Sequence, residues 1–580
     1  MKKILLIVTL LCLGITLWAV PTERTRVKVR LVDGSEIFVT TFGDEHLSWM
    51  QTDDGQVVLP AEDRPGLYVR SSALPETLVA ESDRRRTAAR RIGSKENSSL
   101  PVTGNPKVAV VLVNFQDSVF SVGKTDEEIR AYYELYWNGT RNGHRYTGHG
   151  SYGSVRDYFI AQSDSLFQPE FVIIGPVTLD EGVATYGQNS GSSKDVGFSS
   201  FIKESITKAM KVYDGDWTQF DNKGRGGNYV DLMFFLFAGC GENTVQTQPY
   251  LLWAKEQTVT YTVTLDNGKT VSIGTSACGP ENRCKTWNES RTAPASVASD
   301  GIGVTLHEVS HALGLPDFYD TRSNASGFGM DIWSLMDYGC YMQNGNAPVG
   351  YTAYERDFLG WRPLEVLTEA GPYTLDAIAS ETGRGLKMVN PENKDEYYVL
   401  EARLNSGWDT ALSKYGKGLQ VTHVDWSGTQ WNSNKVNTVT DHQRMTIIAA
   451  NNRYVGSTIS GDMAEWRKTW SGNLYPYIYK DEEGVEHCND SLTANSLPVA
   501  KVFTAAGTMP HKLTKIAISE DGKCVSLMYN EDQYDAVRDL QTAGSKGIAT
   551  GTFDLSGRRV KDARKSGMYL IDGRKVVIVQ

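Results

Sequence analysis

The chain has 580 residues, of which 40% are hydrophobic and 22% charged, and it carries a formal net charge of -10 at pH 7. This length suggests about three to four domains, because a single hydrophobic core rarely grows beyond ~250–300 residues. The acidity and the lack of a long polybasic segment argue against nucleic acid or an anionic membrane surface as a partner.

The first 19 residues have the pattern of an export signal. Lys2 and Lys3 precede an apolar run at 4–18, which is shorter than the ~20 residues that a membrane-spanning helix needs. We expect a signal peptide cleaved after Ala19, with an uncleaved anchor as the alternative. No second apolar run is long enough to cross a bilayer, so we expect no stable membrane span and a protein that is secreted or attached to the cell surface.

Residues 20–100 are expected to form a small, β-rich propeptide. Alternating runs at 27–31 and 37–39, separated by Asp-Gly pairs at 33–34 and 54–55, predict hairpins. The arginine-rich residues 83–91 predict an exposed linker, and such a linker between two domains suggests a processing site. A solvated charge run without cleavage is the alternative.

An α/β domain is expected over residues 101–365. Continuous apolar runs at 108–113 and 230–237 predict buried strands, and 171–177 predicts another. Apolar residues recur at helical spacing between 198 and 213, which predicts an amphipathic helix that covers the sheet.

The sequence H-E-V-S-H at residues 307–311 carries the chemistry of this domain. His307 and His311 are four residues apart, so on a helix their Cβ atoms lie about 5–6 Å apart and both imidazoles can bind one Zn²⁺ at about 2.0–2.1 Å. Glu308 points to the side, where it can take a proton from a water on the metal. We therefore predict a zinc site with Glu308 as general base.

A third ligand is expected directly after this helix. Gly314 can adopt the left-handed conformation that ends a helix and Pro316 cannot continue one, so the chain should turn back and bring Asp317 to the metal. Three protein ligands leave a fourth position for water, which is typical of a catalytic zinc. Asp320 and Asp337 are competing candidates for the third ligand.

The segment W-S-L-M-D-Y-G follows at residues 333–339. Together the two segments resemble the zinc motif and Met-turn of the metzincin peptidases. The resemblance implies that Met336 forms a hydrophobic floor under the metal and that Tyr338 helps to stabilise the oxyanion. Asp317 stands where the commonest metzincins have a third histidine, and the extended pattern H-E-x-x-H-x-x-G-L-P-D-x-Y-D is similar to the immune inhibitor A family of secreted bacterial metalloproteases.

This resemblance implies a secreted zinc endopeptidase that hydrolyses peptide bonds of extracellular or host proteins. His307, His311 and Asp317 would bind the metal, and Glu308 and Tyr338 would be catalytic. Protein or peptide substrates would lie along a cleft as an added strand. The alternative is a catalytically inactive surface adhesin or binding protein on a peptidase scaffold, whereas a serine hydrolase is disfavoured because no G-x-S-x-G motif is found.

The family also has an N-terminal region to which residues 43–55 are similar, so the resemblance implies a latent precursor. Residues 20–100 contain no cysteine, and a thiolate therefore cannot mask the zinc. A carboxylate such as Asp44 or Asp53 is the expected masking group.

Residues 366–530 change to short β runs with Gly and Asn turns, which predicts a β-sandwich. Within it, His423 and Asp425 are expected to make structural hydrogen bonds rather than to bind a metal, because a pair of polar residues lacks a full ligand set. Structural Ca²⁺ is conceivable from the many Asp and Asn loops, although no EF-hand spacing supports it.

Residues 531–580 are expected to form a linker and a small C-terminal β domain. Alternating segments at 553–560 and 567–577 with Gly turns resemble the C-terminal sorting domain of Bacteroidetes type IX secretion cargo, which implies the secretion machinery as a partner. A last strand pair of the preceding sandwich is the alternative. The expected fold is therefore multidomain, with a metzincin-like α/β zinc peptidase domain, a β-sandwich and small β domains at both ends.

Seven cysteines are present, and one of them lies in the expected signal segment. An even number in an exported chain permits disulfides. Cys278 and Cys284 flank a short loop and are the best candidate pair, with free, buried thiols as the alternative.

Overall fold

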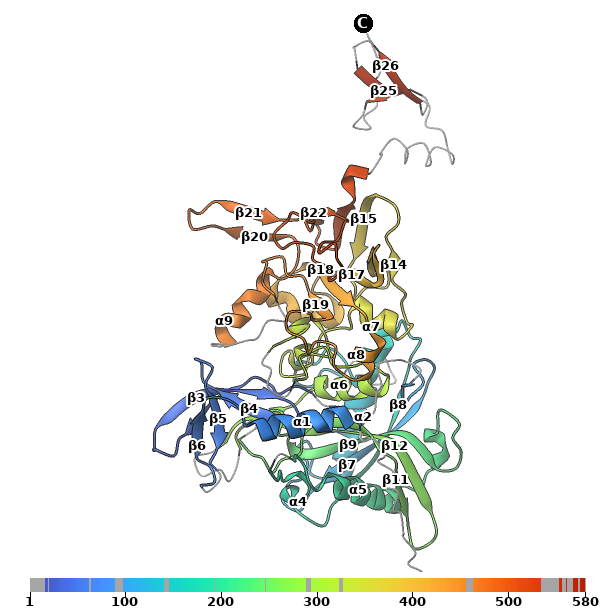
Figure 1. Cartoon of the computed structure of the whole chain (residues 1–580). Coiled ribbons are helices and arrows are strands. Elements are labelled where there is room, and N and C mark those ends of the chain that lie inside the picture. Colours follow the sequence, from blue (N-terminus) through green and yellow to red (C-terminus); the bar gives the residue numbers. More distant parts are fainter. Residues whose placement is uncertain are drawn as a thin grey trace, which may run out of the picture.

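The computed structural model of the chain describes residues 16–18, 20–61, 64–88, 97–139, 146–191, 193–245, 247–287, 294–322, 327–454 and 463–533, and near the C-terminus 552–554, 560, 567–571 and 574–578 (Figure 1). Most of the expected signal peptide and of the expected C-terminal linker lies outside the described residues. Within the described part, no helix is both long and apolar enough to cross a bilayer. The chain forms a multidomain α/β structure with several separate β-sheets.

The N-terminal unit, drawn in blue in Figure 1, is an antiparallel five-stranded meander. Its strands are β2 (Arg26–Arg30), β3 (Glu36–Gly43), β4 (Ser48–Gln51), β5 (Val57–Pro60) and β6 (Tyr68–Ser71), and helix α1 (Glu76–Ala88) follows. The predicted hairpins are present. Residues 83–88 of the predicted linker are helical and continue α1, since Arg and Ala are good helix formers.

The central unit is an eight-stranded sheet with the order β1-β10-β12-β9-β7-β8, to which β11 and β13 add at β12. Its long strands β7, β8, β9 and β12 run parallel to one another, whereas β10, β11 and β13 pair with β12, and β1 with β10, in antiparallel fashion. The strands are β1 (Thr16–Trp18), β7 (Lys107–Asn114), β8 (Glu170–Thr178), β9 (Tyr229–Cys240), β10 (Lys255–Thr258), β11 (Tyr261–Thr264), β12 (Thr270–Trp287) and β13 (Pro294–Ser299).

Strand β7 shows why this sheet needs cover on both faces. Val108, Val110 and Leu112 point into a core shared with α2, α3 and α6, while Ala109, Val111 and Val113 point into a second core with α5. Successive side chains of a strand alternate between faces, so a continuous apolar run is buried on both. The helices are α2 (Asp126–Asn138), α3 (Val155–Gln162), α4 (Val183–Gly187), α5 (Phe198–Val212), α6 (Gly303–Ala312) and α7 (Ala353–Phe358), with short 3-10 turns η2 (Gly148–Gly150), η3 (Trp217–Phe220), η4 (Asp331–Trp333) and η5 (Tyr338–Tyr341).

The downstream unit, yellow to orange in Figure 1, has two sheets that share one apolar core. Their orders are β14-β16-β17-β18-β19 and β15-β23-β22. The elements are β14 (Glu365–Val366), β15 (Gly371–Asp376), β16 (Leu386–Asn390), β17 (Asn393–Arg403), η6 (Gly407–Tyr415), β18 (Gly418–Asp425), α8 (Gly428–Asn432), β19 (Met445–Ile447), α9 (Met463–Lys468), η7 (Thr469–Gly472), β20 (Tyr477–Lys480), β21 (Glu486–Asn489), β22 (Leu513–Ile518), β23 (Cys524–Tyr529) and η8 (Glu531–Gln533).

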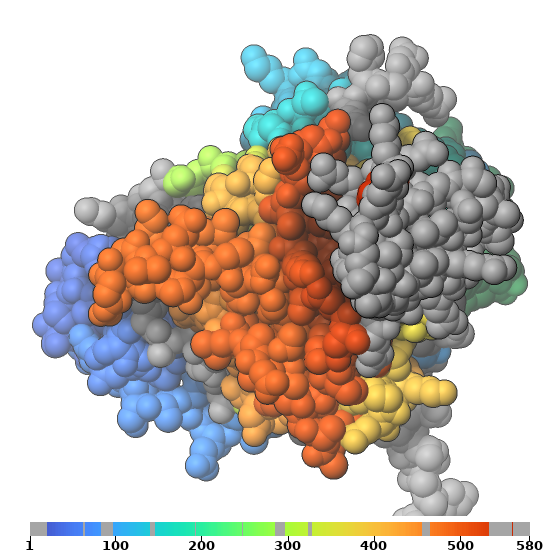
Figure 2. All heavy atoms as spheres, turned by 90° about the horizontal axis from the view of Figure 1, so that it is seen from above, coloured from blue at the N-terminus to red at the C-terminus, as the bar shows by residue number. Residues whose placement is uncertain are grey.

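Near the C-terminus, β24 (Thr552–Asp554), β25 (Gly567–Ile571) and β26 (Arg574–Ile578) form a small antiparallel sheet. Seen from above, the downstream unit covers the middle of the molecule and the N-terminal unit flanks one side of it (Figure 2). In Figure 1, α6 lies between the central sheet and the downstream unit.

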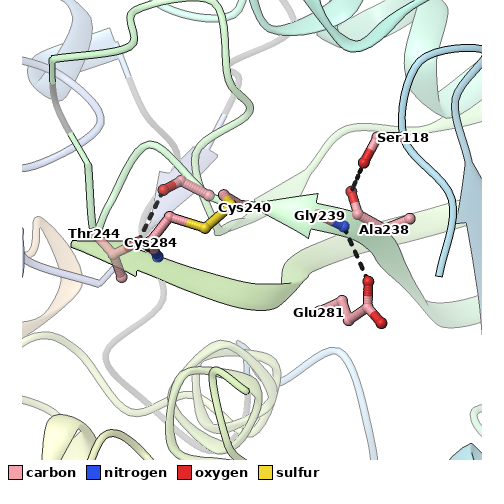
Figure 3. The surroundings of a disulfide bond; sticks show 8 residues. Ser118, Ala238, Gly239, Cys240, Thr244, Glu281 and Cys284 are labelled. Atoms are coloured by element: carbon pink, nitrogen blue, oxygen red, sulfur yellow. Dashed lines mark hydrogen bonds between the residues drawn. A yellow bond between two sulfur atoms is a disulfide. The ribbon is translucent and has the colours of Figure 1, made fainter. Parts of the chain in front are cut away.

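A disulfide joins Cys240 at the end of β9 to Cys284 in β12, with 5.8 Å between the Cα atoms (Figure 3). The predicted pairing of Cys278 with Cys284 is wrong, because both residues lie in the one continuous strand β12. Six residues along a strand span about 20 Å, and a disulfide needs Cα atoms within ~7 Å. Cys278 is instead a buried free thiol whose Sγ donates to the Trp253 carbonyl oxygen at 3.4 Å.

We expect the double substitution Cys240→Ala, Cys284→Ala to lower the free energy of unfolding of the central unit by about 4 kcal/mol. The bond closes a loop with a sequence separation of 44, and the loss of chain entropy for a loop of that size is of this order. Thermal unfolding with and without reductant measures the effect, and Cys488→Ala, which removes an exposed free thiol, is the matched control. A non-reduced peptide map that links Cys278 to Cys284 would contradict the assignment.

Candidate metal centre

Helix α6, which carries the H-E-x-x-H motif, is buried along its whole length. It begins so close to η5 that a Cβ atom on Gly303 would lie 1.9 Å from the Cys340 carbonyl oxygen. It ends before Gly314, which has a φ of 102°, as expected for a glycine that terminates a helix. The motif is therefore fixed at both ends of a short, solvent-excluded helix.

The two motif histidines direct the same ring nitrogen to a common point. Nδ1 of His307 lies 2.9 Å from the Leu335 carbonyl oxygen, and Nδ1 of His311 lies 2.8 Å from that of Leu315. A carbonyl oxygen only accepts, so each Nδ1 carries the proton and each Nε2 presents a lone pair. The two Nε2 atoms are 3.1 Å apart, an arrangement that calls for a cation between them.

Asp317 completes this group. Its Oδ1 lies 3.1 Å from Nε2 of His307 and 3.3 Å from Nε2 of His311. Tetrahedral zinc with bonds of about 2.0–2.1 Å places its ligand atoms roughly 3.3 Å apart. The described His, Cys, Asp and Glu residues contain this one group that could hold a metal ion, and two imidazoles with one carboxylate suit zinc.

The two competing carboxylates have other partners. Asp320 forms an ion pair with Arg322. Asp337 Oδ2 accepts the backbone N–H groups of Gly329, Met330 and Asp331 at 2.8–3.1 Å, which shapes the loop before the Met-turn segment.

Asn434 of the downstream unit orients the third candidate ligand. Its Nδ2 donates to Asp317 Oδ2 at 2.5 Å, and its Oδ1 accepts the Asp317 backbone N–H at 2.8 Å. Thr321 Oγ1 donates to the Asn434 carbonyl oxygen at 2.6 Å. Asn434 could not be predicted from the sequence. It lies in an irregular segment 117 positions from Asp317, and no residue spacing links the two.

Glu308 is fully buried beside the group. Burial, reinforced by the neighbouring Asp317 carboxylate, raises the pKa of Glu308 well above its ordinary value. Its Oε1 accepts the backbone N–H of Val20 at 3.0 Å, while its Oε2 has no hydrogen-bond partner among the described protein groups. Glu308 therefore faces a peptide nitrogen of the N-terminal part of the chain.

The segment that reaches Glu308, residues 20–25, is called here the leading segment. Strand β1, just before it, pairs antiparallel with the edge strand β10. Trp253 Nε1 donates to the Val20 carbonyl oxygen at 3.2 Å, and the Tyr341 hydroxyl donates to that of Pro21 at 2.6 Å. The leading segment thus lies against Glu308 at the candidate metal centre.

The expected masking carboxylates are not part of the metal group. Asp53 is an exposed partner of Arg26, and Asp44 Oδ1 accepts the His46 backbone N–H at 2.9 Å. The group that the N-terminal unit presents to Glu308 is a backbone N–H instead, which has no signature in the sequence.

The Met-turn segment packs under α6. Met336 is fully buried and its carbonyl oxygen accepts the Phe318 N–H at 2.8 Å, next to Asp317. Tyr338 is buried against Phe328 and Tyr341, and burial raises its pKa to about 12, which keeps its hydroxyl neutral at physiological pH.

The polar pair in the downstream unit makes structural hydrogen bonds, as predicted. His423 Nε2 lies 2.9 Å from Glu396 Oε1, and Asp425 Oδ2 lies 2.7 Å from His442 Nε2.

Comparison with known proteins agrees with this geometry. Residues 97–362 match the model of the immune inhibitor A peptidase M6 catalytic domain. These residues are called here the M6 domain, after the family model that they match. The M6 domain includes the whole α6 motif and the Met-turn segment.

Individual relatives of the M6 domain are distant. The chain is 22% identical over 277 residues to the pre-pro-metalloprotease PrtV of Vibrio cholerae, a match that covers 44% of the chain and 29% of that relative. It is 23% identical over 226 residues to immune inhibitor A of Bacillus thuringiensis, with 35% of the chain and 31% of the relative covered. The chain thus spans about a third of the length of these curated relatives.

We expect Asn434→Ala to weaken zinc binding by about 10- to 100-fold, because the loss of a partner that orients a metal ligand has effects of this size. Zinc affinity is measured by competition with a fluorescent chelator, together with the melting temperature of the metal-free protein. Asn393→Ala, which removes a turn amide in the same unit, is the control. An unchanged affinity in Asn434→Ala would show that Asp317 needs no such support.

Proposed function

We propose that the protein is a secreted, zinc-dependent endopeptidase with a metzincin-like catalytic unit. The observation that carries the proposal is the meeting of two imidazole Nε2 atoms and one carboxylate oxygen within 3.1–3.3 Å, directly beside the buried Glu308. His307, His311 and Asp317 are the proposed zinc ligands. The match of residues 97–362 to the M6 peptidase catalytic domain supports the same reaction.

Zinc, when bound, supplies a Lewis acid that polarises the scissile carbonyl and makes water a better nucleophile. Glu308 takes the proton from the attacking water and passes it to the departing amine. The 3.0 Å contact between Glu308 Oε1 and the Val20 nitrogen supports this second role, since it is the distance to a peptide nitrogen in the cleft. The neutral hydroxyl of Tyr338 is the proposed donor to the developing oxyanion.

Substrates of this enzyme are proposed to bind as an added strand on β10. The pairing of β1 with β10 offers a template, because residues 16–18 align with residues 256–258 in antiparallel register. Since β1 lies within the proposed signal peptide, cleavage after Ala19 would leave the outer edge of β10 open to a substrate strand. Main-chain hydrogen bonds of this kind give affinity without strong sequence preference. Extracellular or host proteins with extended, accessible segments are the proposed substrates.

The protein is further proposed to be made as a zymogen, with residues 1–19 as signal peptide and residues 20–100 as propeptide. The leading segment covers Glu308, and the N-terminal unit holds it there: Thr22 N–H donates to the Gly43 carbonyl oxygen at 2.8 Å, and Thr41 Oγ1 donates to that of Glu23 at 2.9 Å. The printed name of the Vibrio relative, a pre-pro-metalloprotease, is consistent with processing in two steps.

The remaining boundaries are also proposals: a catalytic domain at 101–365, a β-sandwich at 366–530 and a linker with a sorting-type β domain at 531–580. The shared core of the two downstream sheets supports the sandwich. The three antiparallel strands β24, β25 and β26 are compatible with a domain that the type IX secretion machinery reads.

We expect Glu308→Gln to retain zinc and to lose activity by about 10²- to 10⁴-fold, the usual contribution of a general acid–base group. Cleavage of casein by the processed protein, with zinc content measured in parallel, tests this. Glu465→Gln, at an exposed site, is the control, and chelation should abolish activity of the native protein. Undiminished casein cleavage by Glu308→Gln would end the proposal.

We expect Thr41→Val to raise the residual activity of the unprocessed precursor by roughly threefold to tenfold, because it removes a hydrogen bond that anchors the leading segment. The neighbouring Thr40→Val is the matched control. Initial rates of cleavage of a fluorescence-quenched peptide measure this residual activity of the unprocessed precursor. If the propeptide is removed on activation, both variants yield the same processed enzyme, so any difference that persists after processing would speak against latency as the cause.

A further inference from the structure

The leading segment shows how a peptide chain fits beyond Glu308. Because the Val20 nitrogen lies where Glu308 would meet a departing amine, Val20 marks the first residue on the carboxyl side of a scissile bond. Glu23 is then the fourth residue on that side. The backbone N–H of Glu23 donates to the Asn243 carbonyl oxygen at 3.0 Å, so the central unit itself holds this position.

The Glu23 side chain forms an ion pair with Arg283, which stands in β12. The Arg283 side chain is 1% exposed and that of Glu23 is 9% exposed. Arg283 precedes Cys284, whose disulfide to Cys240 fixes this part of β12. The guanidinium is therefore a rigid, buried feature of the cleft, and it stays when the N-terminal unit leaves.

The surroundings of Arg283 favour the binding of an anionic side chain. Its Nε and Nη1 have no hydrogen-bond partner among the described protein groups. Asp300 is the other carboxylate that acts on Arg283, and burial, reinforced by the neighbouring Glu23, raises the pKa of Asp300 to about 8. Arg467 adds a second positive charge that acts on Glu23 and hydrogen-bonds Tyr338.

A buried guanidinium without a charged partner is costly, whereas a carboxylate placed against it is favourable. Removal of the leading segment therefore opens a subsite that a substrate carboxylate can refill. We propose that Arg283 is a specificity-determining residue, which selects glutamate or aspartate at the fourth position after the scissile bond. The inference rests on the proposed peptidase function and assigns one of its subsites.

The test compares quenched peptides that differ only at this fourth position, with Glu, Gln or Lys, on the processed enzyme. We expect kcat/KM to be at least roughly 30-fold higher for Glu than for Gln, the lower end of the range seen when one partner of a buried charge pair is removed, and lower again for Lys. Arg283→Gln should remove the preference for Glu over Gln. Arg225→Gln, at an exposed arginine of the same unit, should keep it.

The peptide comparison uses the native enzyme, so it remains decisive even if Arg283→Gln does not fold. Zinc-dependent casein cleavage with equal rates on the Glu and Gln peptides would overturn the subsite and leave the peptidase intact. A protein without any peptidase activity would end the proposed function instead. In that case the subsite is tested by binding of the synthetic peptides VPTERT and VPTQRT to the processed protein, and equal affinities would overturn it.

Discussion

Two imidazole lone pairs and a carboxylate oxygen held within 3.1–3.3 Å of one another are the constraint on which the rest of the structure depends. In a buried setting this cluster is stable only around a cation, because like-facing lone pairs repel more strongly at low dielectric. The surrounding fold prepares it: the carbonyl groups of Leu335 and Leu315 set both tautomers, and the turn at Gly314 brings Asp317 back toward the helix. The proposed binding of zinc would therefore be coupled to the folding of this region.

The downstream unit also supports the candidate metal centre. Asn434 positions Asp317, and the buried Arg403 donates from Nη1 to the Gly350 carbonyl oxygen at 3.1 Å and from Nη2 to that of Trp333 at 3.3 Å. Each of these bonds joins the downstream unit to the M6 domain. The two units are therefore separate in the sequence, with a boundary near residue 365, but they pack together in the structure. An isolated M6 domain would leave the Asp317 carboxylate without its amide partner.

The sequence predicted features that are encoded by residues close together in the chain, and it did not predict contacts between residues far apart. His307, Glu308 and His311 follow from helical spacing, and the two-faced burial of β7 follows from its continuous apolar run. The Cys240–Cys284 bond was missed because strand β12 runs straight through both Cys278 and Cys284, and closeness in sequence was mistaken for closeness in space. Asn434 and the Val20 nitrogen were out of reach, since neither a distant amide nor a backbone group leaves a pattern of residue types.

The leading segment explains how one cleft can be both permissive and selective. Pairing of β1 with β10 uses main-chain groups that every peptide has, and the contacts of Trp253 and Tyr341 are also to backbone carbonyl groups. Main-chain contacts hold a strand without distinguishing its sequence, so discrimination has to come from side chains further along. Glu23 against Arg283 is such a contact, since it joins opposite charges in a buried site. Under the proposed subsite, Arg283 holds the leading segment through Glu23 and selects a substrate carboxylate once that segment has gone.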